Sequence, residues 1–267
     1  SHTGLNFLLI SDGSLRSQSA IAMGGYMARL SHAQVLLLGI GQDPGKLADH
    51  MQDARKQMGS GMASFQIQSS SSPFSEAVTQ AVEKLFFDLA IIGWRPTAGY
   101  RQPELLLQTG DQHVFLATNP KVHLNRALIC LASGEPGKDT VSFTGRLLRH
   151  MGAEATLLSA IPESLNSPHS QKRIERFLVD GQNSLARFGI DSQTIIRKGD
   201  LLNAIQKERQ NKDYDLIVLG APLPDPQGLI GLGGVIGKVI SSIPDSSFLI
   251  VQSRQYQRLK FQLRRGK

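Results

Sequence analysis

The chain has 267 residues, of which 40% are hydrophobic and 19% charged, and it carries a formal net charge of +7. These values exclude a disordered chain, and no apolar run approaches the roughly 20 residues that cross a bilayer, so they predict a soluble globular protein of one large or two smaller domains. The single cysteine, Cys130, cannot form an internal disulfide, so a reducing, cytoplasmic compartment is expected.

The predicted elements of the first half alternate short apolar runs with amphipathic stretches. The predicted strands are Phe7–Ile10, Val35–Ile40, Ser64–Gln68 and Leu89–Ile92, and the predicted helices contain Ile21–Leu30, Leu47–Met58 and Ser75–Lys84. Phe7–Ile10, Val35–Ile40 and Leu89–Ile92 are apolar runs rather than alternating patterns, which indicates a sheet covered on both faces. With helices between the strands, the pattern predicts a parallel, doubly wound α/β fold.

The second half repeats this order of elements. Its predicted strands include Gln193–Arg197 and Leu216–Leu219, and its predicted helices contain Ile174–Phe188 and Leu201–Arg209. Gly59 and Gly189 stand where the second helix of each half is expected to stop.

A direct alignment of the two halves supports an internal repeat. Three pairs of segments align without gaps: Leu5–Ile40 with Arg126–Ile161 at an offset of 121, Phe74–Trp94 with Leu201–Ala221 at 127, and His113–Asn119 with Ser247–Ser253 at 134. The first offset brings Gly24 to Gly145. The sequence therefore predicts two tandem domains, residues 1–122 and 123–253, followed by a basic tail, residues 254–267.

The net charge belongs to that tail. The two predicted domains are each close to neutral, whereas residues 254–267 contain six basic residues and no acidic one. Nucleic-acid binding by the folded body is therefore not expected. For the tail two interpretations stay open: contact with an anionic membrane surface, or a solvated helical or disordered segment.

The order of strand, Asp-Gly-Ser, helix and strand, with a later apolar strand closing on glycine, resembles the universal stress protein family, in tandem form. The resemblance implies a nucleotide site made by an Asp after the first strand and by a Gly-x2-Gly-x9-Gly-Ser/Thr motif after the fourth. Glycines let the backbone approach phosphate oxygens, and the N–H groups at a helix start complement the negative charge.

In the first domain this motif is present only at the first strand. Asp12, Gly13 and Ser14 match the first-strand motif, but Trp94-Arg95-Pro96-Thr97 follows Gly93, so the phosphate loop is predicted to be lost. Asp12 and Ser14 fit a ligand-contact pair and ordinary turn and N-cap chemistry equally well. We expect Trp94 to pack across its loop rather than to stack on a base.

The second domain has the complementary part of the motif. Its candidate nucleotide-binding residues are Gly220, Gly231, Gly233 and Gly234, and Ser133 stands in place of the first-strand Asp. The segment Gly231–Lys238 satisfies neither a Walker loop nor a dinucleotide fingerprint. A glycine-rich turn leading into a packed helix is the favoured reading of that segment.

The sequence contains no metal-ligand spacing and no local catalytic constellation, so a non-enzymatic protein is predicted. One interpretation is a regulatory or assembly module, namely the cytoplasmic domain of a membrane transporter, because Ile92-Gly93-Trp94 and the missing loop are similar to the C-terminal domain of cation-chloride cotransporters. Its partner would then be a transmembrane domain of the same polypeptide, with tethering to the inner face of the cell membrane and no cofactor.

The alternative is a free-standing tandem stress protein that binds ATP or AMP in the second domain. A homodimer is expected under both interpretations, because the strands at the ends of parallel sheets need covering.

Overall fold

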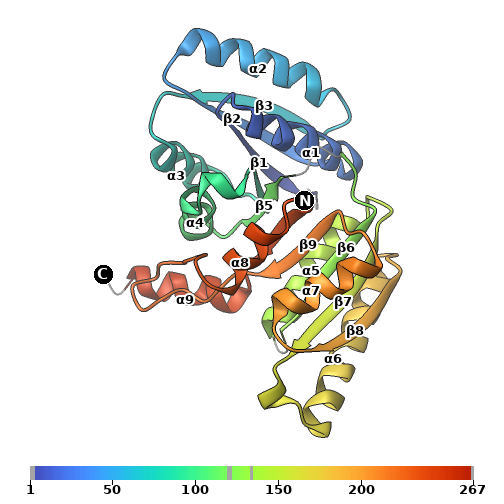
Figure 1. Ribbon diagram of the computed structural model, residues 1–267. Helices are drawn as coiled ribbons and strands as arrows, with labels where there is room; N and C mark the ends of the chain where they lie inside the picture. The colour runs from blue at the N-terminus through green and yellow to red at the C-terminus, as the bar shows by residue number, and fades with distance from the viewer. Residues whose placement is uncertain (1–3, 119–121, 133–134, 266–267) are drawn as a thin grey trace. The chain divides into compact units, whose positions relative to one another are not determined.

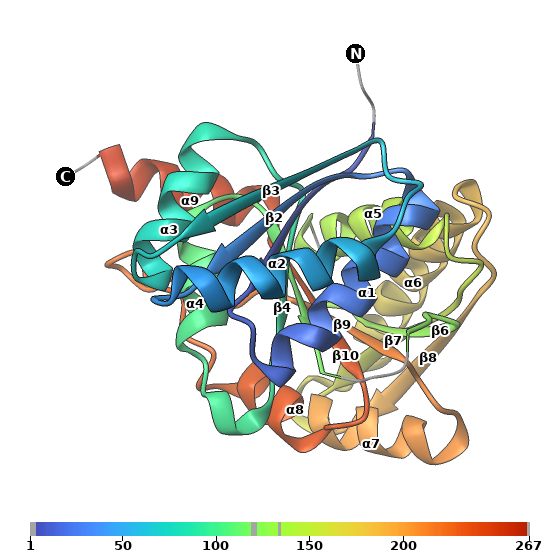
Figure 2. The same cartoon turned by 90° about the horizontal axis from the view of Figure 1, so that it is seen from above.

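The computed structural model describes residues 4–118, 122–132 and 135–265. The chain divides into two compact units, Ser1–His123 and Leu124–Lys267. Each unit is an α/β structure with its own five-stranded parallel sheet, and Figures 1 and 2 show the elements.

Unit 1 alternates strands and helices throughout. Its elements are β1 (Asn6–Ser11), α1 (Leu15–Ser31), β2 (Gln34–Ile40), α2 (Pro44–Met58), β3 (Ser64–Ser70), α3 (Phe74–Lys84), β4 (Leu89–Gly93), α4 (Arg101–Thr109) and β5 (His113–Ala117). The strand order is β3-β2-β1-β4-β5, with all pairs parallel. The chain order reverses at β1, so the space beyond β1 and β4 is where ligands bind in doubly wound folds.

Unit 2 has the same topology. Its elements are β6 (Arg126–Cys130), α5 (Glu135–Leu148), β7 (Glu154–Ile161), α6 (Pro168–Arg187), β8 (Ser192–Lys198), α7 (Leu201–Asn211), β9 (Leu216–Gly220), α8 (Val235–Ser242), β10 (Ser247–Val251) and α9 (Arg254–Arg265). The strand order is β8-β7-β6-β9-β10, again parallel. The predicted fold class of two doubly wound α/β units is confirmed.

The burial of α2 shows how closely periodicity predicted the core. The buried residues of this helix are Leu47, Met51, Ala54 and Met58, which are the apolar positions of its predicted stripe. Asp43 begins the helix by accepting hydrogen bonds from the N–H groups of Gly45 and Lys46. Gly59 ends it with φ 67°, a left-handed conformation that glycine adopts without a steric penalty.

The sheet register corrects the predicted alignment of the two halves by one residue. The Asp88 carboxylate accepts a hydrogen bond from Asn6 N, and the Asp215 carboxylate accepts one from Arg126 N. Asn6 and Arg126 are therefore equivalent, an offset of 120 rather than 121. Gly145 then matches Gly25 instead of Gly24. The sequence comparison slipped because runs of leucine align almost as well one residue apart.

The C-terminal segment forms a helix with an inward side. In α9, Lys260 is only 3% exposed and its ammonium donates to Gln252 Oε1. From the sequence, the tail is expected to be a solvated helical or disordered segment or to contact a membrane surface. It is a helix, and Lys260 departs from the solvated interpretation because this charged group is buried against a polar partner. No helix in the described ranges combines the length and apolar character needed to span a membrane.

Candidate functional site

Each unit has a cavity at the carboxyl ends of its central strands, and the two cavities differ greatly in size. The cavity in unit 1 has a volume of about 80 Å³ and lies beside Asp12. The cavity in unit 2 has a volume of about 440 Å³ and reaches the last residues of β6, β7, β9 and β10. Both lie where the topology of the fold predicts a ligand.

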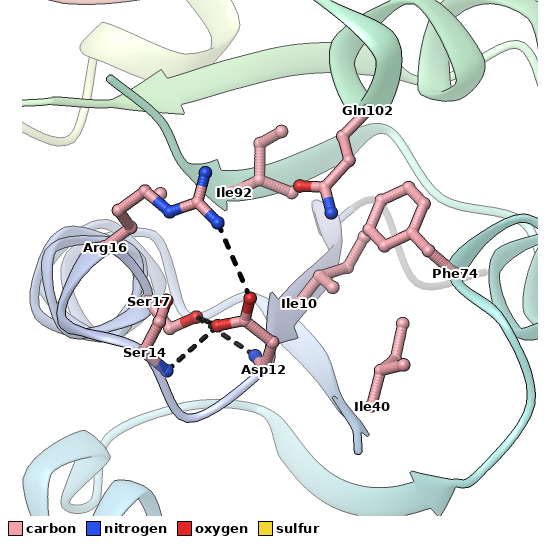
Figure 3. Close-up of a pocket in the computed structure, with 10 residues that line it drawn as sticks. Ile10, Asp12, Ser14, Arg16, Ser17, Ile40, Phe74, Ile92 and Gln102 are labelled. Atoms are coloured by element: carbon pink, nitrogen blue, oxygen red, sulfur yellow. Dashed lines mark hydrogen bonds and ion pairs between the residues drawn. The ribbon is translucent and has the colours of Figure 1, made fainter. Parts of the chain in front are cut away.

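In unit 1 the Asp12 carboxylate is occupied by its own loop. Its Oδ1 accepts hydrogen bonds from Ser14 N at 2.9 Å and Ser17 Oγ at 2.7 Å, and its Oδ2 lies 3.8 Å from the Arg16 guanidinium (Figure 3). Burial acts to raise the pKa of Asp12, but the hydrogen bonds from Ser14 and Ser17 and the charge of Arg16 together lower it below its usual value. Asp12 thus acts as a local brace for the β1–α1 turn.

The neighbouring loop residues complete this turn. Gly13 has φ 76°, and a Cβ added there would lie 2.5 Å from the His50 ring, so only glycine fits. Ser14 is the residue before α1, but its side chain makes no capping hydrogen bond. The predicted turn chemistry is therefore present, carried by Asp12 rather than by Ser14.

The end of β4 closes the remaining space. A Cβ added at Gly93 would lie 1.8 Å from the carbonyl oxygen of Arg16, so the first turn of α1 lies directly against this strand. Beyond Gly93, Trp94 is 2% exposed, stacks on Tyr100 and donates from Nε1 to Gly99 O at 2.7 Å. The prediction that Trp94 packs across its loop is confirmed.

The cavity of unit 2 is mostly apolar. The residues that line it are Cys130, Leu131, Ala132, Gly137, Thr140, Ala160, Pro162, Gly199, Asp200, Leu201, Leu219, Gly220, Ala221, Val235, Ile236, Val251, Ser253 and Tyr256. Among the described residues, no lysine or arginine belongs to this lining. Its volume falls within the range of roughly 300–1,000 Å³ that is common for small-molecule sites.

The predicted glycines take different places around this cavity. Gly220 lines it, and a Cβ added there would meet only Thr140 Oγ1, at 3.8 Å. Gly234 precedes α8, whose first two residues line the cavity, whereas Gly231 and Gly233 stand further back along the loop. A Cβ at Gly231, Gly233 or Gly234 would meet nothing within 4 Å, so their backbone groups are open to approach.

The corrected register changes the residue that stands in for Asp12. Ala132, which is exposed and lines the cavity, is equivalent to Asp12, whereas Ser133, the expected substitute, lies outside the described residues. An alanine leaves no carboxylate at this position.

The carboxylate that the sequence reasoning missed is Asp200, at the start of α7. Its side chain accepts a hydrogen bond from Asn203 N at 2.9 Å, which together with other local hydrogen bonds lowers the pKa of Asp200. Gly199 and Asp200 stand between a predicted strand, Gln193–Arg197, and a predicted helix, Leu201–Arg209, and Asp is a common residue at a helix start. This pattern could have indicated from the sequence that Asp200 lies at the carboxyl end of a strand. Burial raises the pKa of both Cys130 and Tyr256, so the thiol and the phenol are neutral polar groups in the lining.

Comparison with known proteins shows the fold of the chain. No protein-family model and no curated protein matches it. Among solved structures, a universal stress protein from Archaeoglobus fulgidus DSM 4304 superposes with a TM-score of 0.63 at 14% identity, covering 92% of this chain and 98% of its own. A functionally unknown protein from Pseudomonas aeruginosa PAO1 gives 0.63 at 14% identity, covering 98% of each chain. The chain therefore has a universal stress protein fold over nearly its whole given length.

Proposed function

We propose that unit 2 is a non-enzymatic sensor module that binds a nucleoside monophosphate of the AMP type. The observation that carries the proposal is the cavity of about 440 Å³ beyond β6, β7, β9 and β10, which unit 1 lacks. The small size of the unit 1 cavity supports one ligand per chain.

The lining fits the parts of such a ligand. Apolar side chains such as Leu131, Pro162 and Leu219 offer surfaces for a planar base. The two oxygens of the Asp200 carboxylate accept hydrogen bonds from Asn203, and each keeps a further lone pair that can accept a ribose hydroxyl. At the other side, the N–H groups at the start of α8 favour a phosphate, and the open space beside Gly231, Gly233 and Gly234 lets it approach.

The charge of the lining favours one phosphate over three. A triphosphate needs several positive groups, and no lysine or arginine in the described lining supplies them. Of the two ligands considered from sequence, ATP and AMP, the cavity therefore fits AMP better.

Isothermal titration of the intact chain with AMP tests this function. The wild type is expected to bind one AMP per chain, and Gly220→Leu to abolish binding because its side chain would enter the cavity. Gly45→Leu, at an exposed glycine of α2 in unit 1, is the matched control and should bind normally. Absence of heat with AMP, adenosine and ATP at millimolar concentration would overturn the proposal, and tighter binding of ATP than of AMP would overturn the preference for one phosphate.

The transporter interpretation is the second candidate, and the small cavity of unit 1 is the observation that favours it. A unit that keeps its sheet while its own side chains fill the ligand space suits an assembly role. Immunoblotting of fractionated source cells separates the two functions. A membrane-bound band much larger than the chain would support a regulatory domain attached to a transporter, and a soluble band of the chain's own mass would exclude it.

A further inference from the structure

The outermost strands of the two units differ in charge. β3 reads Ser-Phe-Gln-Ile-Gln-Ser-Ser and contains no charged residue and no proline, whereas β8 ends in Arg197 and Lys198. Natural proteins protect exposed strand edges with charges, prolines or coverings, because an unprotected edge pairs with other strands. β8 carries such charges in its own sequence and β3 carries none; the charge recorded beside β3 is the Arg55 guanidinium of α2, 5.9 Å from the centroid of the Phe65 ring.

The backbone groups of β3 are available at that edge. Ser70 O accepts a hydrogen bond from Gly41 N at 3.0 Å, so the groups of Ser70 face β2. Because residues alternate along a strand, the N–H and C=O groups of Phe65, Ile67 and Ser69 point away from β2. None of these groups has a hydrogen-bond partner among the described residues, and β3 is the last strand of the unit 1 sheet (Figure 2).

An apolar surface accompanies the open edge. Leu85 and Phe86 are 49% and 69% exposed, and they border a hollow of about 290 Å³ that extends to Ser64 and Gln66 of β3. The equivalent residues of unit 2 are Lys212 and Asp213, which are polar. Exposed apolar residues beside an unpaired strand are typical of an interaction surface.

Unit 2 fills the equivalent hollow with its own side chains. The Tyr214 hydroxyl lies 2.8 Å from Glu208 Oε1 and 3.0 Å from Thr156 Oγ1, and Gln193 donates to Thr156. In unit 1 these positions are Phe87, Ala81, Leu36 and Gln66, which cannot form that cluster. The open surface is thus a specific property of unit 1.

We propose that β3 pairs antiparallel with β3 of a second copy of this chain, about a two-fold axis at Ile67. In this register Ile67 faces Ile67, and Phe65 faces Ser69, so the outward N–H and C=O groups of all three residues gain partners. Gln66 faces Gln68 on the other side of the sheet, where their amides bond across the axis.

The second copy is the occupant because the strand is complementary to itself. β3 contains no charged residue, so none of its residues repels its counterpart across the axis. The residues that face each other are an apolar pair at Ile67, apolar with small at Phe65 and Ser69, and polar with polar at Gln66 and Gln68. A two-fold pair also satisfies both edges with one contact, which is the usual symmetry of soluble homodimers. This interface is separate from the proposed nucleotide site, so each can fail independently.

Sedimentation equilibrium of the intact chain tests the interface. The wild type is expected to form a dimer of twice the chain mass. The double variant Gln66→Lys/Gln68→Lys places lysines directly opposite each other twice and should weaken the dimer about tenfold. The variant Thr194→Lys adds positive charge at an exposed position of β8, the corresponding strand of unit 2, and should leave dimerisation unchanged.

A second variant tests the backbone pairing itself. Ile67→Pro removes the outward N–H at the axis, which an edge strand tolerates on its solvent side, and should also weaken the dimer. Circular dichroism verifies that each variant remains folded. A wild-type chain that is monomeric at every concentration, or a dimer that persists unchanged in folded lysine and proline variants, would overturn the proposal.

Discussion

The two units share topology and strand register, but the described residues near the end of the first strand of each unit differ in what they place above the sheet. In unit 1, Asp12 and Ser17 bond to each other across the turn. Their equivalents in unit 2 are Ala132 and Gly137, which have almost no side chain. The size of the cavity in each unit therefore depends on which side chains the first helical turn places over the strand ends.

Gly93 and Gly220, the last residues of β4 and β9, show the same difference in the space available above the two sheets. A Cβ at Gly93 would lie 1.8 Å from the Arg16 carbonyl oxygen, whereas a Cβ at the equivalent Gly220 would lie 3.8 Å from Thr140 Oγ1. The glycine of unit 1 is required for close packing, and that of unit 2 leaves open volume.

The largest expected effect is that of Gly93→Ala. The new methyl group would collide with backbone that cannot move without displacing α1, so the free energy of unfolding should fall by about 3 kcal/mol or more. Urea denaturation measures this change. The matched variant Gly220→Ala should change stability by less than about 1 kcal/mol, and equal losses at the two glycines would contradict the comparison.

The next effect concerns the polar cluster of unit 2. Tyr214 is 5% exposed, and its hydroxyl is hydrogen-bonded to Glu208 and Thr156. Tyr214→Phe introduces the residue that unit 1 has at the equivalent position, Phe87, and removes that hydroxyl. Because two buried polar groups lose a partner, thermal or urea unfolding should show a loss of about 1–2 kcal/mol.

The reciprocal variant Phe87→Tyr is the control for that swap. It would bring a hydroxyl to a place where unit 2 has polar residues and unit 1 has Leu36 and Ala81, so it should destabilise unit 1 as well. A stabilised Phe87→Tyr variant would show that the two hollows are alike. In the wild type, burial raises the pKa of Tyr214 to about 12, so its hydroxyl keeps its proton throughout the neutral range.

A smaller, pH-dependent effect is expected at Asp12. Folding lowers the pKa of Asp12, so its carboxylate stabilises unit 1 fully at pH values above the ordinary pKa of Asp. This stabilisation is lost as the pH falls through the lowered pKa of the folded state. Asp12→Asn should therefore cost about 1 kcal/mol at neutral pH and progressively less in acid. Denaturation midpoints measured from pH 7 to pH 3 give the curve. A constant difference between variant and wild type would refute the role of the charge.

The smallest effect on stability is expected at Asp200. Asn is as good an N-cap as Asp, so Asp200→Asn should leave the unfolding midpoint nearly unchanged while weakening AMP binding through loss of the ribose acceptor. Asp43→Asn makes the same change at the cap of α2 in unit 1 and should leave titration with AMP unaffected. Equal binding by all three proteins would remove Asp200 from the proposed site.

Local sequence predicted the elements well because burial periodicity is a local property. Strands such as Leu89–Ile92 and the stripe from Leu47 to Met58 were found within one or two residues of their observed places. The helix α4 was not predicted, because Arg101–Thr109 follows a loop that the repeat does not share. The candidate glycines were chosen by motif, and motif spacing gave no sign of Asp200.

The sequence alone was sufficient to predict two parallel α/β units of one pattern, because apolar runs, helix caps and the repeat are local features of the chain. The folded structure was needed to show which unit has the larger cavity, which residue is equivalent to Asp12, and which uncharged strand lies at the edge of its sheet. Those properties depend on distances between residues far apart in the chain. A contact such as that of Gly93 with Arg16 exists only when strand and helix are packed together.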